Sequence, residues 1–552
     1  MPYLQRSAEG EGFFMRVLPT RRGSTRRDFL KWSAAAGGAA AMAGCPFNAR
    51  CPDDLPAGEV NESVNIAILG SGFGGAVAAA RLTEASLPVT LVERGRRWDI
   101  TGQANQPFSR TLLPDKRTSW LSNFVNLPII PPAIKIPIQK YIGVLERIRE
   151  DGIDVYVGAG YGGGSLVYAA IQIEQTEDVF NSLFPAELSY EDFHNDFYPR
   201  VRSRMTPSPM PDDILATNFW KYARVFDQQT RNAGLESIRF PTGTDWDVIR
   251  AEIRGEAPAS AIVGESLGTN SGYKTSLDMN YLRDAEMTGL LTVHLQTEVQ
   301  TITSVGKSRY MVHCNTIDEH GCVIGKRNIM CNHLFMAMGS VHTTKKLVEA
   351  RETNALPGLN DSVGQNWGNN GNTFYKRDLV GDLTGILQGS PLAFGAGSAP
   401  DMPYAILENA QFPVPIECAC LFHFCVALTE ARGSFGYDST TGKARLHWPQ
   451  GNNQESVAAA QAMVDRFNNA NGGILSPLIV AGIQDEATIH PVGGTAIGEA
   501  CDLAGRLEGH DNLYVVDGAL MPGSGGAVNP SLTIAALAEQ CLDTLLAEQI
   551  WT

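Results

Sequence analysis

Long apolar runs and basic charge are both scarce in this 552-residue sequence, and each shortage excludes a class of protein. No apolar run reaches the ~18 residues that a membrane-spanning helix requires. Asp and Glu number 59 against 44 Lys and Arg, which gives a net charge of −15. Such a chain repels nucleic-acid phosphates and anionic lipid headgroups, so we expect no nucleic-acid partner.

Cysteine spacing gives no sign of a metal site. Of the ten cysteines, Cys45 and Cys51 lie in or beside the basic N-terminal segment. The others form no C-x-x-C pair, and Cys418, Cys420 and Cys425 cluster without the histidine spacing of a metal site. We therefore predict no metal. One or more disulfides are possible, but their pairing cannot be read from the sequence.

The first 45 residues have the order of an export signal. They carry seven basic and three acidic groups, so their net charge is +4. Ser24–Lys31 contains a twin arginine, and the Ala/Gly-rich stretch Trp32–Gly44 has the length of a signal-peptide core. We predict a twin-arginine leader over residues 1–45 and a periplasmic, secreted or lipid-anchored protein. Lipid anchoring would follow from Met42–Cys45, which resembles a lipoprotein cleavage box with Met where Leu is usual.

A glycine-rich loop between two β-prone runs is the first chemical motif. Val64–Leu69 leads into the G-x-G-x-x-G sequence Gly70–Gly75, and a helix-like stretch, Ala76–Ala85, follows. A second apolar run, Val89–Val92, ends at an acidic residue. Strand, loop, helix, strand and acid together are the βαβ context of a dinucleotide-binding site.

Each residue type in this motif has a physical role. Gly70 permits a tight turn, Gly72 lets the backbone approach a pyrophosphate, and Gly75 lets helix and strand pack closely. The helix N-terminus attracts phosphates, and Glu93 is placed to bind ribose hydroxyls. The motif alone does not choose between NAD and FAD.

Two further blocks extend the pattern. Val155–Val167 holds five glycines within seven residues, which lets backbone lie against a flat ring or a pyrophosphate. Near the C-terminus, Leu513–Gly518 is a strand ending in Asp-Gly, followed by Asn529–Pro530 and a helical run, Ser531–Leu546.

Together these blocks resemble the glucose–methanol–choline family of FAD-dependent oxidoreductases, most of all its non-covalent cholesterol oxidases. The resemblance extends over nearly everything between residues 64 and 548. The segments that carry it are Tyr141–Arg147, Gly158–Val167, Leu334–Ser340, Arg432–Asp438, His490–Gly494 and Asp517–Pro530.

The resemblance implies an α/β fold with a Rossmann-like FAD-binding domain and a substrate domain of antiparallel sheet and helices. The FAD domain would combine residues 61–170, 275–365 and 485–552. The substrate domain would comprise 171–274 and 366–484, with a six-stranded sheet. Short β-prone runs agree with this division: Met311–His313, Leu334–Ala337 and Cys420–Val426.

Alcohol oxidation by a flavin requires a group that accepts a hydrogen bond from the hydroxyl and a second group that fixes orientation. By resemblance, His490 is the catalytic histidine and Asn529 is the asparagine beside flavin and substrate oxygen. Glu408, in the apolar segment Ile406–Pro413, resembles the glutamate that moves a proton from sterol C4 to C6. Burial would raise the pKa of such an isolated carboxyl. Glu417 is a nearby alternative.

The resemblance also implies the residues that contact the cofactor. They are Gly70, Gly72, Phe73, Gly74, Gly75, Glu93, Gly163, Gly164, Ser165, Tyr168, Ala169, Ile171, Val299, Asp517, Gly518, Asn529 and Ser531. No histidine lies between residues 143 and 193, where some relatives link their flavin, so we expect FAD to be bound non-covalently.

Some segments depart from the family pattern. Tyr168–Ile171 stands where Asn-Gly-Gly-Met is usual, Ser531 replaces an aromatic residue, and Gly525–Ala527 alters the loop before Asn529. These changes affect the choice of alcohol more than the type of reaction. Phe124–Ile138 is apolar and proline-rich, which fits either a lid or membrane-contact lip, or a buried connection between lobes.

The leading hypothesis is an oxidase that converts a 3β-hydroxysterol to the 3-ketone with O2, releases H2O2 and isomerises the Δ5 product to Δ4. A second hypothesis is a dehydrogenase of the same family that acts on another hydrophobic or small alcohol with a non-oxygen acceptor. A third is a non-redox flavin lyase or a sterol-binding lipoprotein. Retention of His490, Asn529 and both glycine blocks argues against a loss of catalysis.

Overall fold

The computed structural model places the body of the chain in one compact unit, Arg50–Thr552. The predicted leader and Cys45 lie outside the described residues. The structure describes residues 51, 58–100, 106–127, 135–412, 414–476 and 486–551.

A seven-stranded sheet is built around the first glycine motif. β1 (Glu59–Leu69) pairs in parallel with β2 (Val89–Val92) on one side and with β11 (Val323–Met336) on the other. β2 continues in parallel to β8 (Leu291–His294). The end of β11 pairs in parallel with β20 (Leu513–Val515).

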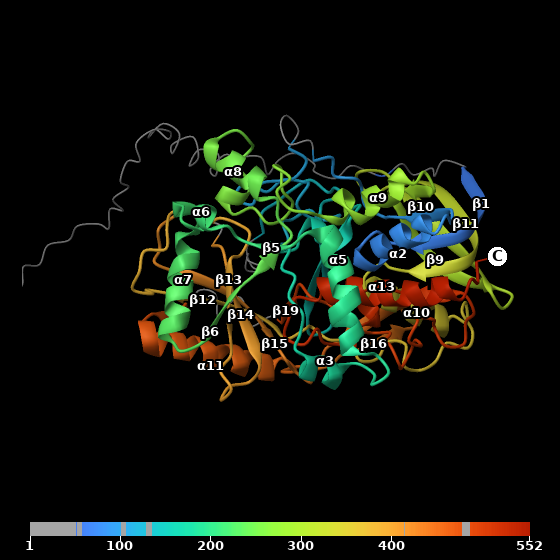
Figure 1. Ribbon diagram of the computed structural model, residues 1–552. Coiled ribbons are helices and arrows are strands. Elements are labelled where there is room, and N and C mark those ends of the chain that lie inside the picture. Colours follow the sequence, from blue (N-terminus) through green and yellow to red (C-terminus); the bar gives the residue numbers. More distant parts are fainter. Residues whose placement is uncertain are drawn as a thin grey trace, which may run out of the picture. The chain divides into compact units, whose positions relative to one another are not determined.

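Two antiparallel strands complete this sheet: β10 (Arg309–Ile317) pairs with the beginning of β11, and β9 (Thr297–Val305) pairs with β10. The last four residues of β1 are fully buried, as expected for an apolar strand covered on both faces. α2 (Phe73–Glu84) and α13 (Ser531–Ala547) pack against each other beside the sheet (Figure 1). α2 begins three residues before the predicted start, inside the glycine motif itself.

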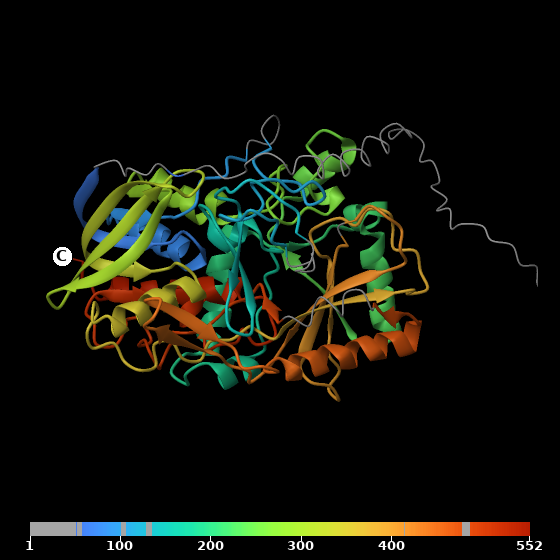
Figure 2. The ribbon, with the colours of Figure 1, turned by 180° about the vertical axis from the view of Figure 1, so that it is seen from behind.

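A second, wholly antiparallel sheet of six strands lies beside the first (Figures 1 and 2). One of its faces is covered by α7 (Lys221–Asn232) and α11 (Gln454–Asn471), which pack against each other. The predicted α/β fold class with a second, antiparallel sheet is confirmed; the domain boundaries remain a prediction. The strand order is β18 (Ile474–Leu475), β12 (Asn372–Asp378), β15 (Leu421–Ala427), β14 (Ala405–Ala410), β13 (Phe394–Gly397) and β6 (Glu236–Arg239).

Shorter elements surround the two sheets. The smaller sheets contain β3 (Leu145–Arg149), β4 (Asp154–Gly158) and β19 (Ala487–Thr488), the hairpin β16 (Ser434–Asp438) and β17 (Lys443–His447), and the pair β5 (Ser208–Pro209) and β7 (Pro241–Thr242). The other α-helices among the described residues are α3 (Glu177–Leu183), α4 (Tyr190–Asp192), α5 (Tyr198–Met205), α6 (Asp212–Leu215), α8 (Trp246–Arg254), α9 (Tyr281–Met287) and α10 (Ser340–Glu352). No helix among the described residues is long and apolar enough to cross a membrane.

Two disulfides within the described part of the chain supply pairing that the sequence left open. Cys51 pairs with Cys322 across 271 residues and so joins the start of the compact unit to the turn before β11. Cys418 pairs with Cys420 in the loop before β15.

The flanks of the apolar segment Phe124–Ile138 are described, and residues 128–134 are not. Val125 and Ile138 are buried, and the Val125 N–H donates to the Ile136 carbonyl at 2.9 Å. The Phe124 side chain is 41% exposed. The described flanks are therefore mixed: Val125, Leu127 and Ile138 are buried, whereas Phe124, Lys135 and Pro137 are exposed.

Candidate active site

A cavity of about 760 Å³ is lined by both sheets. The residues predicted to contact the cofactor line it, with the exception of Gly75 and Ser165. Those that line it are Gly70, Gly72, Phe73, Gly74, Glu93, Gly163, Gly164, Tyr168, Ala169, Ile171, Val299, Asp517, Gly518, Asn529 and Ser531.

The first glycine loop turns directly from β1 into α2. Gly70 has φ +102°, and a Cβ there would lie 2.2 Å from the Ala337 carbonyl oxygen, so only glycine fits. A Cβ on Gly75 would lie 2.1 Å from the Gly70 oxygen, which explains the close approach of helix and strand. By contrast, a Cβ on Gly72 would meet no atom within 4 Å. Gly72 therefore presents bare backbone to the cavity.

Glu93, at the end of β2, is tied to this loop. One carboxylate oxygen accepts hydrogen bonds from the Ser71 N–H at 3.2 Å and from the Ser71 hydroxyl at 2.6 Å. The other accepts from the Gly95 N–H at 2.8 Å. The carboxylate is buried on the cavity wall, so its charge is held next to the N-terminus of α2.

Ser165 stabilises the second glycine block through hydrogen bonds but does not line the cavity. Its hydroxyl donates to the Gly162 carbonyl at 2.7 Å and accepts from the Leu277 N–H at 3.0 Å. The side chain is fully buried and does not reach the cavity wall.

Asp517 joins the end of β20 to the start of α10. Its carboxylate accepts from the Gly339 N–H at 2.7 Å, the Thr343 hydroxyl at 2.5 Å and the Ala519 N–H at 2.8 Å. Burial raises its pKa to about 6 in spite of these hydrogen bonds.

This wall suits an elongated, phosphate-bearing cofactor. The N-terminus of α2 favours negative charge, and the open face of Gly72 lets phosphate oxygens reach backbone N–H groups. Glu93 supplies a carboxylate where ribose hydroxyls would bind. These features fit the FAD that the sequence predicts.

The opposite wall is the inner face of the six-stranded sheet. Side chains alternate across a strand, and accordingly the lining residues of β14 (Glu408 and Ala410) and of β15 (Phe422 and Phe424) are two positions apart. Phe374, Phe422 and Phe424 form an aromatic surface there. Glu408 on β14 stands directly across from Phe424 on β15, and its side chain is the carboxyl within this surface.

Glu408 is only 2% exposed. Burial raises the pKa of its carboxyl to about 8, although a hydrogen bond from the Asn529 amide opposes the shift. The Glu408 carboxyl is therefore poised to take up or release a proton near neutral pH.

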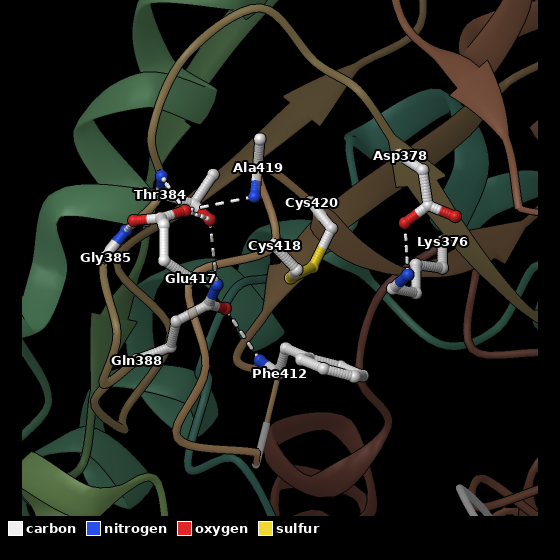
Figure 3. Close-up of a disulfide and its surroundings, with 10 residues drawn as sticks. All are labelled: Lys376, Asp378, Thr384, Gly385, Gln388, Phe412, Glu417, Cys418, Ala419 and Cys420. Atoms are coloured by element: carbon white, nitrogen blue, oxygen red, sulfur yellow. Dashed lines mark hydrogen bonds and ion pairs between the residues drawn. A yellow bond between two sulfur atoms is a disulfide. The ribbon is translucent and has the colours of Figure 1, made fainter. Parts of the chain in front are cut away.

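Glu417 lies in a different setting (Figure 3). Its exposed carboxylate accepts from the backbone N–H groups of Thr384 at 3.0 Å, Gly385 at 2.6 Å and Ala419 at 3.0 Å. Partial burial would raise its pKa, but these hydrogen bonds lower it below its ordinary value. Glu417 organises the loop around the Cys418–Cys420 disulfide and does not line the cavity.

His490 and Asn529 meet at the end of the cavity beside Glu408. The Asn529 Nδ2 lies 3.5 Å from His490 Nε2, and the Asn529 Oδ1 is buried without a partner. The Phe424 ring stands edge-on to His490 at 5.2 Å. Burial lowers the pKa of His490 to about 3, so the imidazole is neutral at physiological pH. The structure thus brings together the three residues that the sequence predicted as catalytic; their roles stay predictions.

Sequence reasoning missed the supporting residues of this site. Phe374, Phe422 and Phe424 were not singled out, although alternating aromatic residues in a β-run were a usable signal. Asn372, which contacts His490 from 118 residues away, gave no signal beyond its place in an Asn-Asn-Gly-Asn turn.

Comparison with known families gives three matches. Residues 370–479 match the model "GMC oxidoreductase, C-terminal", and residues 440–538 match "GMC oxidoreductase". Residues 23–43 match the signal sequence of the twin-arginine translocation pathway. The predicted export by this route is confirmed, which makes the protein periplasmic or secreted.

Curated relatives of similar length include two named cholesterol oxidase. The one from Acinetobacter baumannii is 22% identical, over 89% of this chain and 97% of the relative. The one from Mycobacterium tuberculosis is 23% identical, over 86% of this chain and 90% of the relative.

Solved structures share the fold. Pyridoxine 4-oxidase from Mesorbium loti superposes with a TM-score of 0.60 at 15% identity, over 88% of this chain and 99% of that one. A fungal aryl-alcohol oxidase superposes with a TM-score of 0.59 at 13% identity, over the same shares of the two chains. Proteins of this kind generally bind FAD. The family models over residues 370–538, the curated relatives and the shared fold together support the glucose–methanol–choline family of oxidoreductases that act on alcohols.

Proposed function

We propose that this protein binds FAD non-covalently and oxidises the 3β-hydroxyl of a cholesterol-like sterol to the 3-ketone. Two electrons and two protons pass from the alcohol to O2, which gives H2O2. A Δ5 ketone is then isomerised to the conjugated Δ4 ketone without net oxidation.

The observation that carries this proposal is the place of Glu408. A simple alcohol needs no acid–base group beyond those that contact its hydroxyl. Glu408 stands among three phenylalanines, is 2% exposed and has a pKa of about 8. A carboxyl in this setting suits proton transfer between two carbons of an apolar substrate, and that step is needed only when the product is an unconjugated ketone.

The other roles follow from the same geometry. Bound FAD supplies the hydride acceptor. His490 and Asn529 hold the substrate hydroxyl, while the aromatic wall covers the apolar body and excludes water. Glu408 takes a proton from C4 and returns it to C6.

The name of the two curated relatives supports the sterol, and the shared fold supports an alcohol more generally. We assign residues 61–170, 275–365 and 485–552 to the FAD-binding domain, and 171–274 and 366–484 to the substrate domain. For a sterol drawn from a bilayer, the exposed Phe124 ring offers an apolar membrane contact.

The test is a substrate panel on the purified, FAD-loaded protein, following peroxide and conjugated-enone absorbance together. The panel contains cholesterol, its saturated 3β-hydroxy analogue, an aryl alcohol and pyridoxine. We expect peroxide from both sterols and enone from cholesterol alone. Flavin reduction only by the aryl alcohol or pyridoxine would refute the sterol, and reduction without peroxide would show a dehydrogenase.

Acid precipitation of the same protein tests the mode of FAD binding. All flavin should appear in the supernatant. Flavin that stays with the polypeptide would refute non-covalent binding.

A further inference from the structure

The His490 imidazole is held between two amide side chains. Asn372, the first residue of β12, places its Nδ2 at 3.2 Å from His490 Nδ1. Asn529 places its Nδ2 at 3.5 Å from His490 Nε2. Both amides thus offer an N–H to the ring, but a neutral imidazole has one acceptor nitrogen and one N–H. Only one of the two contacts can therefore be a hydrogen bond that an amide N–H donates to the ring.

The orientation of the Asn372 amide is fixed by its oxygen. Oδ1 accepts the Ile489 backbone N–H at 3.1 Å, and this N–H can only donate. The Thr488 hydroxyl lies 2.9 Å from the same oxygen. A reversed amide would place an NH2 group against the Ile489 N–H, so Nδ2 must face His490. Nδ2 also donates to the Asn370 carbonyl at 3.2 Å, which uses its second proton.

The Asn529 amide is not fixed in this way. Its Oδ1 is buried and has no partner, and its contact with His490 is the longer of the two. Rotation of this amide costs it no hydrogen bond on the oxygen. Its nitrogen also donates to Glu408, but the neutral Glu408 carboxyl can instead donate to an Oδ1 that is turned toward it. The hydrogen bond that is kept is therefore the one from Asn372 Nδ2 to His490 Nδ1, and Nε2 carries the ring proton.

We propose that Asn372 is a positioning residue that holds His490 in the Nε2–H tautomer, so that the ring presents a hydrogen-bond donor to the substrate oxygen. This inference rests on the proposed function only for the identity of that oxygen. It assigns to His490 a hydrogen bond donated from Nε2–H to the substrate oxygen, rather than acceptance of the hydroxyl proton. It also explains why Asn372 is itself anchored: the Asn453 side chain donates to its carbonyl at 3.2 Å.

The tautomer is measured directly by long-range ¹H–¹⁵N correlation spectra of the FAD-loaded protein with ring-labelled histidine. The chain has ten histidines, and His490 is assigned by its absence from the spectrum of His490→Gln. We expect a protonated Nε2 and an unprotonated Nδ1 at neutral pH. The reverse pattern, or a doubly protonated ring, would overturn the proposal without any variant at Asn372.

Asn372→Asp then inverts the arrangement. The substituted side chain has nearly the same size, but an oxygen replaces the group that donates to Nδ1. We expect the proton to move to Nδ1, and we expect the rate of anaerobic flavin reduction by substrate to fall roughly 10²–10⁴-fold. An unchanged tautomer, or an inverted tautomer with an unchanged rate, would each contradict the proposal.

Asn453→Asp is the matched control, since it adds the same charge to the same cluster without touching the ring. It should keep the Nε2–H tautomer; inversion there would show a general effect of charge and overturn the role of Asn372. If the wild type oxidises no alcohol in the panel, the proposed function fails, yet the spectra still decide whether Asn372 sets the tautomer.

Discussion

The two walls of the cavity handle polar groups in opposite ways. On the cofactor wall, Glu93 accepts three hydrogen bonds and Asp517 accepts three more, while Gly72 leaves backbone bare. On the substrate wall, Glu408 is enclosed by aromatic rings, and the Asn529 Oδ1 has no partner.

This difference separates binding from chemistry. A wall whose polar groups are satisfied is rigid and suits a cofactor that stays in place. A wall with a neutralised carboxyl and an unpaired amide oxygen suits groups that exchange protons and hydrogen bonds with a passing substrate. Variants on the cofactor wall should therefore lose FAD affinity, and variants on the substrate wall should lose reaction rate or change the product.

The largest effect is expected at the junction of the walls. His490→Ala and Asn529→Leu should each slow anaerobic flavin reduction roughly 10²–10⁴-fold while FAD stays bound, because they remove groups that orient the alcohol. Stopped-flow absorbance of the flavin measures this rate. His447→Ala, at an exposed histidine paired with Asp151, is the control. Near-normal reduction in His490→Ala would remove this residue from the site.

Glu408→Gln should change the product rather than stop oxidation. Amide and acid are nearly the same size, so packing survives while proton transfer is lost. Cholesterol should still reduce FAD, and the Δ5-3-ketone should accumulate, as shown by chromatography at early times. The control is Glu417→Gln, which alters a carboxylate outside the cavity wall. Full-rate formation of the Δ4 product by Glu408→Gln would show that another group moves the proton.

Gly72→Ala tests the cofactor wall. The added methyl meets no protein atom within 4 Å, so the fold should be kept, but it occupies the space that a phosphate would approach. We expect the Kd for FAD to rise on the order of 10-fold, which corresponds to about 1.4 kcal/mol. Flavin fluorescence titration of the apoprotein measures it. Gly58→Ala, at an exposed residue before β1 whose Cβ is equally free and which does not line the cavity, should bind FAD normally.

The cofactor wall was far more predictable from sequence than the substrate wall. Its first part is contiguous in the chain, because loop, helix and strand follow one another from β1 to Glu93. Backbone geometry there demands glycine, which leaves a readable pattern. The substrate wall is assembled by antiparallel pairing of β12, β14 and β15, and it gathers side chains from positions that periodicity does not connect.

Glu408 and Asn372 show what the sequence alone could not predict about the site. Resemblance picked out Glu408, but only the structure separates the two carboxylates: Glu408 is buried on the cavity wall opposite Phe424, and Glu417 does not line the cavity. Asn372 could not be predicted, because its contact with His490 depends on how β12 meets the loop after β19. The disulfides stayed open for the same reason: Cys51 and Cys322 are brought together only by the folded sheet.

The smallest expected effect is on stability, and its sign distinguishes the two glutamates. The pKa of Glu408 is about 8 in the folded protein, against about 4.3 for an unfolded glutamate. Between these values the folded state holds a proton that the unfolded chain releases, so the stability contributed by Glu408 is lost as pH rises through about 8. The Tm of Glu408→Gln should therefore rise relative to the wild type between pH 5 and pH 9.

Glu417 has a lowered pKa, so its carboxylate stabilises the fold above the unfolded pKa, and this contribution disappears as pH falls. Glu417→Gln should thus be less stable than the wild type at neutral pH and approach it in acid. Thermal melts of the FAD-loaded proteins between about pH 3 and pH 9 measure both differences. Parallel pH dependences for the two variants would contradict the contrast between a neutral carboxyl inside the cavity and an ionised one outside it.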